Sequence, residues 1–449
     1  MVKVPSPEGL FGLDLAGVAP RLAEGGCNRA VTGEAVGWVA CFLGLASAGT
    51  VVSGHNRGMT DISSVSWTDA SGQAQTARWR SEAAVSAPHK WVLADDTLNA
   101  NTAYRWVCEG TALIWQGDFQ NARQLLQALA RRIDRKPRKL KAPATQMAEV
   151  FHQHRQGQAQ RARLLGMLLI PVAPDYSVPL RRAPEVRQAL TEVWGAPDGQ
   201  PSLLTLRELQ GLIGAHEWRK KGVEIPALGP APRNRIHPHY GVFSPVRGEY
   251  VELVRQAPWP AAWGPEARAF DIGAGTGVLS AVLARRGARQ VVATDQDPRA
   301  LACAEANLRQ LGVANAVQLV QQDLFPAGQA ALVVCNPPWL PARPSSPIEH
   351  AVYDPDSRML RGFLAGLAAH LVPQGEGWLI LSDLAEHLGL RSRQQLMGWI
   401  ADAGLQVLGR LDARPQHPKA SDPGDPLHRA RAAEVTSLWR LGHAAAVAV

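Results

Sequence analysis

The segment from residue 267 to residue 286 limits the fold of this chain more than any other. In it, an apolar stretch is followed by a glycine-rich turn and then by a helical pattern. The apolar stretch, Ala267–Ile272, has the composition of a buried strand, and Val278–Arg286 is predicted to be helical. Between them stand Gly273, Gly275 and Gly277. Glycines at alternate positions let the backbone turn tightly and let a ligand lie against the main chain at the helix N-terminus. The segment therefore predicts a strand, a ligand-binding turn and a helix.

Strands and helices continue to alternate after this turn. Further strands are predicted over Gln290–Thr294, Val317–Gln321, Ala331–Cys335, Trp378–Leu381, Leu405–Leu411 and Glu434–Leu441. Helices are predicted to end near Leu308 and to span Arg358–Leu371 and Arg393–Ala403. This alternation is typical of a mostly parallel sheet with helices on both faces. The expected fold class is α/β, with seven strands in the sheet.

The glycine turn departs from the dinucleotide-binding pattern. The pattern G-x-G-x-x-G requires a glycine at position 278, where Val278 stands. The chain also shows no obvious group of residues for hydride transfer. An NAD-dependent oxidoreductase is therefore disfavoured.

Carboxylates follow the second and third predicted strands. Asp295 stands where an acid can accept hydrogen bonds from both hydroxyls of a ribose. Helix capping is its alternative role, although Asp297, ahead of a proline, suits that role as well. Asp323 and Leu324 follow the third strand, where a carboxylate can accept from an adenine amino group.

The most specific motif is Asn336-Pro337-Pro338-Trp339, directly after the fourth strand. Two consecutive prolines fix the backbone and remove its donors, so the carbonyls there are free to accept. The Asn336 side-chain oxygen and a fixed carbonyl beside it can accept the two N–H groups of a planar NH2. Trp339 offers a flat face on which the amide or nucleobase that carries this NH2 can stack. The motif indicates a site for an acceptor nitrogen. A Pro-Pro turn with a packed tryptophan is the structural alternative.

These motifs together resemble those of class I S-adenosylmethionine-dependent methyltransferases. The similarity is greatest to the small-domain group with an Asn-Pro-Pro-aromatic motif, which methylates amino or amide nitrogens. The resemblance covers about residues 233–445 and implies a Rossmann-like sheet and S-adenosyl-L-methionine as cofactor. A sulfonium methyl group is already activated, so the protein has only to align an in-line displacement and keep the acceptor lone pair available.

The resemblance also implies a role for each motif. The glycine turn holds the methionine part of the cofactor, the acid after the second strand holds the ribose, and the acid after the third lies near the adenine. The segment His239–Pro245 resembles the stretch that covers the cofactor, and a buried linker anchor is the equally weighted alternative. Expected cofactor contacts are Phe243, Asp271, Gly273, Gly275, Gly277, Asp295, Asp323, Leu324 and Asn336. Expected acceptor contacts are Asn336, Pro337, Pro338 and Trp339.

Two departures from the family pattern concern the acceptor pocket. Tryptophan replaces the commoner tyrosine or phenylalanine at position 339, and the loop Leu340–Asp356 is rich in proline. Both border the pocket, so the identity of the acceptor is left open.

The positive charge of the chain is concentrated in its middle. The net charge is +8, and residues 81–240 hold 22 Lys and Arg against 14 Asp and Glu. A basic part beside a neutral one suggests that one part meets a polyanion while the other carries out the chemistry.

A helical hairpin is predicted in the basic part. One helical segment runs from Tyr104 to Trp115, and a second begins at Phe119, its apolar residues recurring every three or four positions until Pro137. Its end carries the cations Arg131, Arg132, Arg135, Lys136, Arg138 and Lys139. These are either a solvated helix end or a surface that contacts a phosphate backbone. The regional charge favours nucleic acid.

Three regions are expected. Residues 1–80, rich in Gly, Ala and Ser without periodicity, are predicted to be poorly ordered. Residues 81–232 form a basic helical accessory domain, and residues 233–449 the catalytic domain. The uncharged stretch Ala35–Gly54 is diluted by glycine and serine, so no membrane span is expected.

Metal and disulfide sites are not indicated. The five cysteines lie far apart, and the histidine pairs 152/154 and 237/239 lack a third ligand nearby. With no secretory signal at Met1–Pro20, a cytoplasmic protein is expected.

The expected function is methylation of an amino or amide nitrogen. The basic part favours a nucleic acid, above all ribosomal RNA, as the acceptor. The resemblance to glutamine-methylating enzymes favours a translation-factor protein instead. A non-catalytic nucleic-acid-binding scaffold that keeps the fold is the competing hypothesis, and the intact glycines and Asn336 speak against it.

Overall fold

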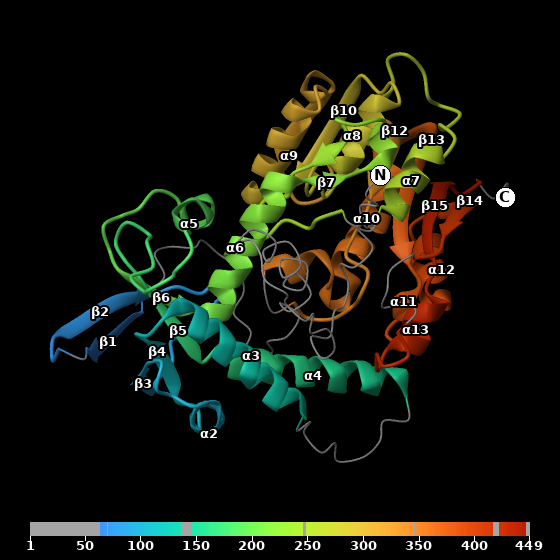
Figure 1. Ribbon diagram of the computed structural model, residues 1–449. Coiled ribbons are helices and arrows are strands. Elements are labelled where there is room, and N and C mark those ends of the chain that lie inside the picture. The colour runs from blue at the N-terminus through green and yellow to red at the C-terminus, as the bar shows by residue number, and fades with distance from the viewer. Residues whose placement is uncertain are drawn as a thin grey trace, which may run out of the picture. The chain divides into compact units, whose positions relative to one another are not determined.

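The chain divides into two compact units. The computed structural model describes residues 63–69, 71–135, 146–245, 248–344, 347–415 and 422–445. Among these, the C-terminal unit comprises residues 146–152 and everything from Trp218 onward, and the N-terminal unit comprises the residues up to 135 and 153–217. Helix α4 (Met147–Leu165) contributes residues to both units (Figure 1).

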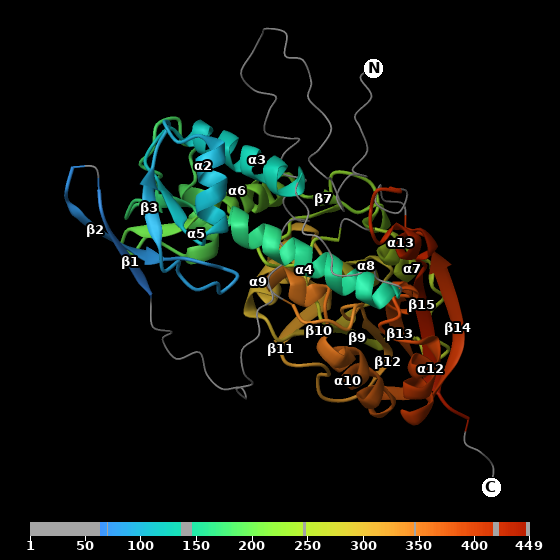
Figure 2. The same ribbon diagram turned by 90° about the horizontal axis from the view of Figure 1, so that it is seen from below.

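A seven-stranded sheet forms the centre of the C-terminal unit. Its strands lie in the order β11-β10-β9-β12-β13-β15-β14, which Figure 2 shows side by side. They are β9 (Arg268–Ile272), β10 (Gln290–Asp295), β11 (Val317–Gln321), β12 (Ala330–Cys335), β13 (Leu371–Ser382), β14 (Leu405–Ala413) and β15 (Thr436–His443). The first five are parallel, and β15 is antiparallel to both of its neighbours. The predicted mostly parallel sheet is confirmed.

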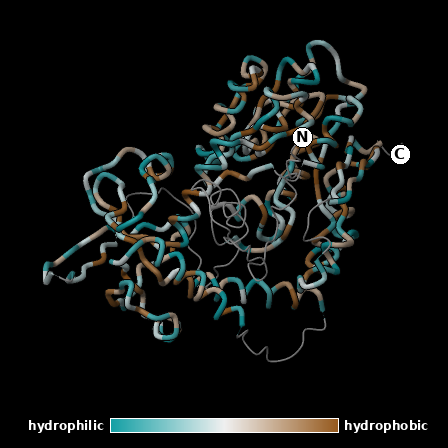
Figure 3. Tube along the Cα trace, viewed as in Figure 1, coloured by the Kyte–Doolittle hydropathy of each residue, from teal (hydrophilic) through white to brown (hydrophobic). Residues whose placement is uncertain are grey.

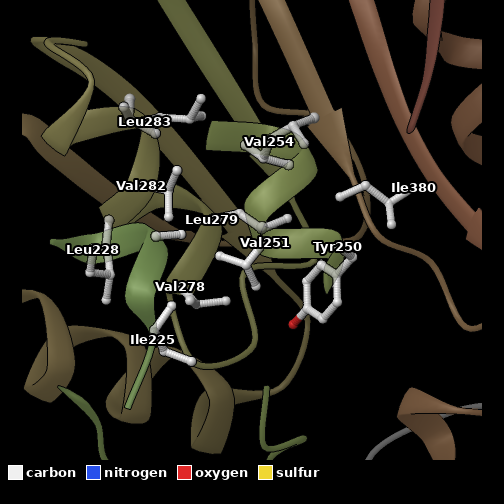
Figure 4. Close-up of a cluster of buried hydrophobic side chains, with 14 of the residues drawn as sticks. Ile225, Leu228, Tyr250, Val251, Val254, Val278, Leu279, Val282, Leu283 and Ile380 are labelled. Atoms are coloured by element: carbon white, nitrogen blue, oxygen red, sulfur yellow. The ribbon is translucent and has the colours of Figure 1, made fainter. Parts of the chain in front are cut away.

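Helices cover both faces of this sheet. They are α7 (Glu249–Gln256), α8 (Val278–Arg285), α9 (Pro298–Gln310), α10 (Arg358–Leu367), α11 (Leu384–His387), α12 (Arg393–Asp402) and α13 (His428–Ala433). One apolar cluster joins α7 and α8 to the sheet through residues such as Val251, Val254 and Leu279 (Figure 4). A second joins α10 and α12 to the other face through residues such as Phe363 and Leu396. Burial of apolar side chains on both faces therefore explains the apolar sequence of the central strands.

Short elements complete the C-terminal unit. They are the paired strands β7 (Val223–Glu224) and β8 (Arg235–Ile236) and the 3-10 helices η1 (Pro226–Leu228), η2 (Ala314–Ala316), η3 (Pro347–Ala351), η4 (Pro355–Ser357) and η5 (Ala368–His370). Of these, η3 and η4 lie in the proline-rich loop between β12 and α10.

The N-terminal unit contains a sheet of its own, so the prediction of a helical accessory domain is wrong. Its six strands lie in the order β1-β2-β6-β5-β4-β3. They are β1 (Ser64–Thr68), β2 (Ala74–Trp79), β3 (Trp91–Ala94), β4 (Ala112–Trp115), β5 (Leu168–Val172) and β6 (Ser202–Thr205). Its helices are α2 (Ala100–Cys108), α3 (Phe119–Arg135), α5 (Arg187–Trp194) and α6 (Leu206–Lys221), beside part of α4. Strand β4 is entirely apolar, whereas β1 and β2 mix polar and apolar residues, and Figure 3 colours the trace by hydropathy.

The error has a physical reason. The sequence predicts that residues 112–115 continue a helix, yet they form β4, an interior strand between β5 and β3 in which all four side chains are buried. A fully buried strand of four residues shows neither the alternation of a half-buried strand nor a helical period. The second predicted helix, α3, is confirmed and runs from Phe119 to Arg135.

The region predicted to be poorly ordered is partly folded. Strands β1 and β2 lie within residues 64–79 and pair with each other, so the prediction is wrong for this stretch. Residues 1–62, which include Ala35–Gly54, lie outside the described residues, as do Lys136, Arg138 and Lys139. Among the described residues, the chain passes from one unit to the other at residues 152–153 and 217–218.

Within the described ranges, no helix is both long and apolar enough to cross a membrane. The same ranges contain no group of three or more His, Cys, Asp or Glu side chains placed to hold a metal ion.

Candidate active site

Three neighbouring strands bring the predicted site residues to one edge of the sheet. Cys335 of β12 pairs with Ile272 of β9, and Ile272 pairs with Thr294 of β10. The next residues along these strands are Asn336, Gly273 and Asp295. Paired strands lie about 5 Å apart, so the three residues start side by side. The strand order also reverses here, and ligands of open α/β sheets bind at such a reversal, outside the carboxyl ends of the strands.

Asp271 joins the glycine turn to the helix that follows it. Its side chain is 1% exposed, and Oδ2 accepts hydrogen bonds from the Ser280 amide at 2.9 Å and the Ser280 hydroxyl at 2.6 Å. Burial raises the pKa of Asp271 to about 6. The other oxygen, Oδ1, is buried and has no hydrogen-bond partner among the described residues. A ligand group that donates hydrogen bonds would satisfy it.

The three glycines of the turn have different surroundings. All have positive φ, +80° at Gly273, +53° at Gly275 and +77° at Gly277. A Cβ on Gly277 would lie 3.1 Å from the Cβ of Ala304 in α9, so close packing of α8 against α9 requires glycine there. A Cβ on Gly275 would meet nothing nearer than a carbonyl oxygen at 4.0 Å. Gly275 thus leaves open space beside the main chain.

Alanine at Gly275 and alanine at Gly277 are expected to affect different properties of the protein. Gly275→Ala should weaken binding of the cofactor analogue S-adenosylhomocysteine by tenfold or more, because the new methyl group enters the space beside the turn. Gly277→Ala should lower the melting temperature more, because the left-handed backbone costs either alanine about 1–2 kcal/mol and only at Gly277 does a clash with α9 add to this. Calorimetric titration and thermal unfolding of both variants check this. A larger loss of stability in Gly275→Ala than in Gly277→Ala would contradict the assignment.

Asp297, rather than Asp295, caps helix α9, and the ribose contact of Asp295 stays a prediction. Asp297 is the N-cap of α9, and its side chain accepts from the Arg299 amide at 2.9 Å. Asp295 accepts from the Gly275 amide at 3.0 Å through Oδ2 and from the Asp297 amide at 2.9 Å through Oδ1. Burial raises the pKa of Asp295. Each oxygen of a carboxylate has a second lone pair, so Asp295 can still accept two hydroxyl groups.

The turn after β11 is held in place by its neighbours. Leu324 has a positive φ of +61°, and its carbonyl accepts from the Thr294 hydroxyl at 2.5 Å. The Asp323 side chain is 53% exposed and lies 3.5 Å from Nη2 of Arg358. An exposed carboxylate on a fixed turn is available to a ligand, and the adenine contact of these two residues stays a prediction.

A hydrogen bond that the sequence did not predict joins the first and last residues of the motif Asn336–Trp339. Oδ1 of Asn336 accepts from Nε1 of Trp339 at 2.9 Å. Trp339 is partly buried and packs against both apolar clusters of the unit. Its carbonyl accepts from Nη1 of Arg391 at 3.5 Å, and the Arg391 side chain is buried. The prediction that Trp339 stacks on an acceptor is not tested by these contacts.

The proline-rich loop after the motif is fixed at both ends. The Leu340 amide donates to the Val352 carbonyl at 3.2 Å, and the Leu340 carbonyl accepts from the Asp354 amide at 2.9 Å. The Asp354 carboxylate accepts from the amides of Met359 at 2.9 Å and Leu360 at 3.2 Å, which caps α10. The loop therefore returns to the glycine turn, where Met359 approaches Gly273.

Phe151 also supports this loop. Its ring is fully buried, and its centroid lies 6.4 Å from that of Tyr353, at an interplanar angle of 59°. Phe151 lies on the part of α4 that belongs to the C-terminal unit. It stands far before the catalytic region in the sequence, so no local pattern points to it.

The segment 237–245 is anchored to helix α9. The His237 amide donates to Oδ1 of Asn307 at 2.7 Å, and Nδ2 of Asn307 donates to the Thr276 carbonyl in the glycine turn at 3.0 Å. The His239 amide donates to Sγ of Cys303 at 3.3 Å. These contacts support the anchor interpretation. Phe243 is partly exposed, and its contact with the cofactor stays a prediction.

In the N-terminal unit, the described arginines of the cationic run line one hollow. Arg131, Arg132 and Arg135, with Ala100 and Ala128, surround a volume of about 380 Å³. Arg132 is held in place, since it donates to Oδ1 of Asn101 and its guanidinium lies 5.1 Å from the centre of the Tyr104 ring. Asp134, the acid of the run, is paired with Arg161 at 2.8 Å. No carboxylate is among the residues that line the hollow.

Comparison with known proteins decides the family. The methyltransferase small domain family matches residues 235–392, which include the glycine turn, Asp295 and the Asn336–Trp339 motif. A release factor glutamine methyltransferase from Deinococcus radiodurans is 32% identical over 219 residues, 45% of this chain and 71% of that protein. The chain belongs to the class I S-adenosylmethionine-dependent methyltransferases. The predicted resemblance is confirmed, and S-adenosyl-L-methionine is the cofactor of this family.

The names of two further relatives give one protein acceptor and one RNA acceptor. The release factor glutamine methyltransferase of Cereibacter sphaeroides is 32% identical over 167 residues, 33% of this chain and 58% of that protein. A tRNA1(Val) (adenine(37)-N6)-methyltransferase from Shewanella is 34% identical over 99 residues, 20% of this chain and 42% of that protein. The matches therefore span less than two thirds of either of these two relatives.

The residues at the sheet edge fit the cofactor of this methyltransferase family. Gly275 leaves space beside the main chain, Asp295 keeps lone pairs for two hydroxyl groups, and Oδ1 of Asp271 lacks a donor. These features match a ribose and an ammonium group, both of which are hydrogen-bond donors in S-adenosylmethionine.

Proposed function

We propose that this methyltransferase transfers a methyl group from S-adenosylmethionine to an amino or amide nitrogen. The observation that carries the proposal is the position of Asn336, one residue beyond the pair between Cys335 and Ile272 and therefore beside the glycine turn. The bound cofactor supplies an electrophilic methyl group on a sulfonium ion.

The chain's own residues orient the acceptor. Oδ1 of Asn336 and the carbonyl of Pro337 accept the two N–H groups of a planar NH2, which holds the nitrogen in place for an in-line displacement. The neighbouring Cys335 thiol is fully buried, and burial raises its pKa, so it stays neutral and offers no nucleophile. Direct transfer to the held nitrogen is the chemistry that this site supports.

Two acceptors are compatible with this geometry. An exocyclic adenine amine and a glutamine carboxamide both present a planar NH2, and the names of the relatives contain both. We favour an RNA acceptor, because the arginine-lined hollow offers positive charge to a phosphate backbone. The choice of ribosomal RNA has no support beyond the sequence. A release factor glutamine is the second candidate, favoured by the extent of the Deinococcus match.

Labelled cofactor tests the proposal directly. The full-length chain is incubated with S-adenosylmethionine carrying a tritiated methyl group and with separate RNA, DNA and protein fractions. Label is expected in the RNA fraction and should be lost with Asn336→Ala. Label in the protein fraction would support the glutamine acceptor instead. Label in no fraction, despite tight binding of S-adenosylhomocysteine, would favour a non-catalytic scaffold.

Neutralising the hollow is expected to change the salt dependence of RNA binding. In Arg131→Gln/Arg135→Gln, the slope of log affinity against log salt should fall by about 1.4–1.8 if each arginine contacts one phosphate. Arg187→Gln is the matched control in the same unit, because Arg187 is already paired with Asp175 and Glu185. Fluorescence anisotropy at several salt concentrations measures the slope. An unchanged slope in the double variant would remove the hollow from the RNA interface.

A further inference from the structure

The tryptophan of the acceptor motif binds the side chain that holds the acceptor. Its indole N–H lies 2.9 Å from Oδ1 of Asn336. An indole nitrogen can only donate, so the end of the Asn336 carboxamide that faces Trp339 must be the oxygen. A phenylalanine at position 339 has no donor, and the hydroxyl of a tyrosine lies at the far end of its ring. The hydrogen bond therefore requires the tryptophan.

The indole itself has a fixed orientation. Its ring packs against apolar residues from both faces of the sheet. The Trp339 carbonyl accepts from Arg391, whose side chain is 4% exposed. The backbone amide of the next residue, Leu340, donates to Val352 at 3.2 Å. Trp339 is thus held by packing and by backbone contacts that do not involve Asn336.

We infer that Trp339 is a positioning residue that fixes which end of the Asn336 carboxamide faces the acceptor. The inference rests on the proposed N-methyltransferase function. A carboxamide turned by 180° would present its NH2 group, which donates and cannot accept an N–H of the acceptor. The indole uses one lone pair of Oδ1 and leaves the other for the acceptor. Trp339 therefore acts on turnover through Asn336.

Removing the donor without changing the shape of the ring tests this role. β-(3-Benzothienyl)alanine, in which sulfur replaces the indole N–H, is introduced at position 339 by amber suppression. Because a neutral hydrogen bond contributes modestly, kcat is expected to fall about 3- to 10-fold, while the KM and the affinity for S-adenosylhomocysteine stay within twofold. The simpler variant Trp339→Phe should lower kcat at least as much. An unchanged kcat with the benzothienyl residue would overturn the inference.

Measuring Trp339→Phe in the Asn336→Asp variant distinguishes a positioning role of Trp339 from a merely structural one. In Asn336→Asp the side chain has two equivalent oxygens, so it has no wrong end to present. The effect of Trp339→Phe on kcat should therefore fall to less than twofold when it is measured in the Asn336→Asp background. An equal loss in both backgrounds would mean that Trp339 acts through stacking or folding instead.

The hydrogen bond can also be observed without turnover. The chain has 14 tryptophans, and the indole signal of residue 339 is the one missing from the 1H–15N spectrum of Trp339→Phe. In Asn336→Ala this signal should move upfield, because the proton loses its acceptor. An unmoved signal would overturn the inference, even if labelled methyl transfer is observed. Conversely, a moved signal with no methyl transfer would leave the contact intact and count against the proposed function.

Discussion

Alanine in place of Asn336 is expected to lower kcat about 100- to 1000-fold while leaving cofactor affinity within twofold. The magnitude is that of removing one preorganised hydrogen-bonding group from a reacting centre. The hydrogen bond to the Asn336 side chain comes from Trp339 and not from the glycine turn, so loss of this side chain is expected to leave that turn intact. Single-turnover methyl transfer measures the first effect, and calorimetric titration with S-adenosylhomocysteine measures the second.

Asn336→Asp is the matched control for this prediction. It keeps an oxygen acceptor for both the indole and the substrate, so it should retain more activity than alanine. A melting temperature close to that of the wild type in both variants would exclude unfolding as the cause. Full activity of Asn336→Ala would show that the acceptor nitrogen is held elsewhere.

Alanine in place of Asp295 is expected to weaken S-adenosylhomocysteine binding by about 100- to 10,000-fold. Each hydrogen bond to a charged group contributes about 1.5–3 kcal/mol, and a ribose offers two hydroxyls. The variant also removes the acceptor of the Gly275 amide, so the turn loses one of its contacts. Calorimetric titration gives the change in Kd.

Asp297→Ala provides the comparison, two residues away. It removes the cap of α9, which should lower stability by about 1 kcal/mol and change cofactor affinity little. Equal losses of cofactor affinity in Asp295→Ala and Asn336→Ala would show that the two roles are wrongly assigned.

The sequence predicted the catalytic fold well because its signals are local. The apolar strand and the three glycines lie within residues 267–277, and each acid directly follows or closely follows its own strand. Parallel strands meet at one edge, so the order of the motifs along the chain already places them together. Asp297 as the helix cap, with Asp295 left for a ligand, was one of the two alternatives that the sequence allowed.

The remaining features depend on contacts between distant segments. Phe151 reaches Tyr353 across some 200 positions, and Arg391 reaches Trp339 from beyond the fifth strand. No period or spacing encodes such contacts. The sheet of the N-terminal unit was missed because its interior strand β4 is only four residues long and uniformly apolar, so its sequence shows no strand alternation.

The chemical position of the transferred methyl group tests the central claim most directly. After reaction with deuterated-methyl S-adenosylmethionine, the labelled fraction is digested to nucleosides or amino acids and analysed by mass spectrometry. The site around Asn336 predicts a product methylated on an exocyclic amino or side-chain amide nitrogen. Label on a carbon, an oxygen or a ring nitrogen would contradict it, because none of these presents the pair of N–H groups that the two oxygens accept.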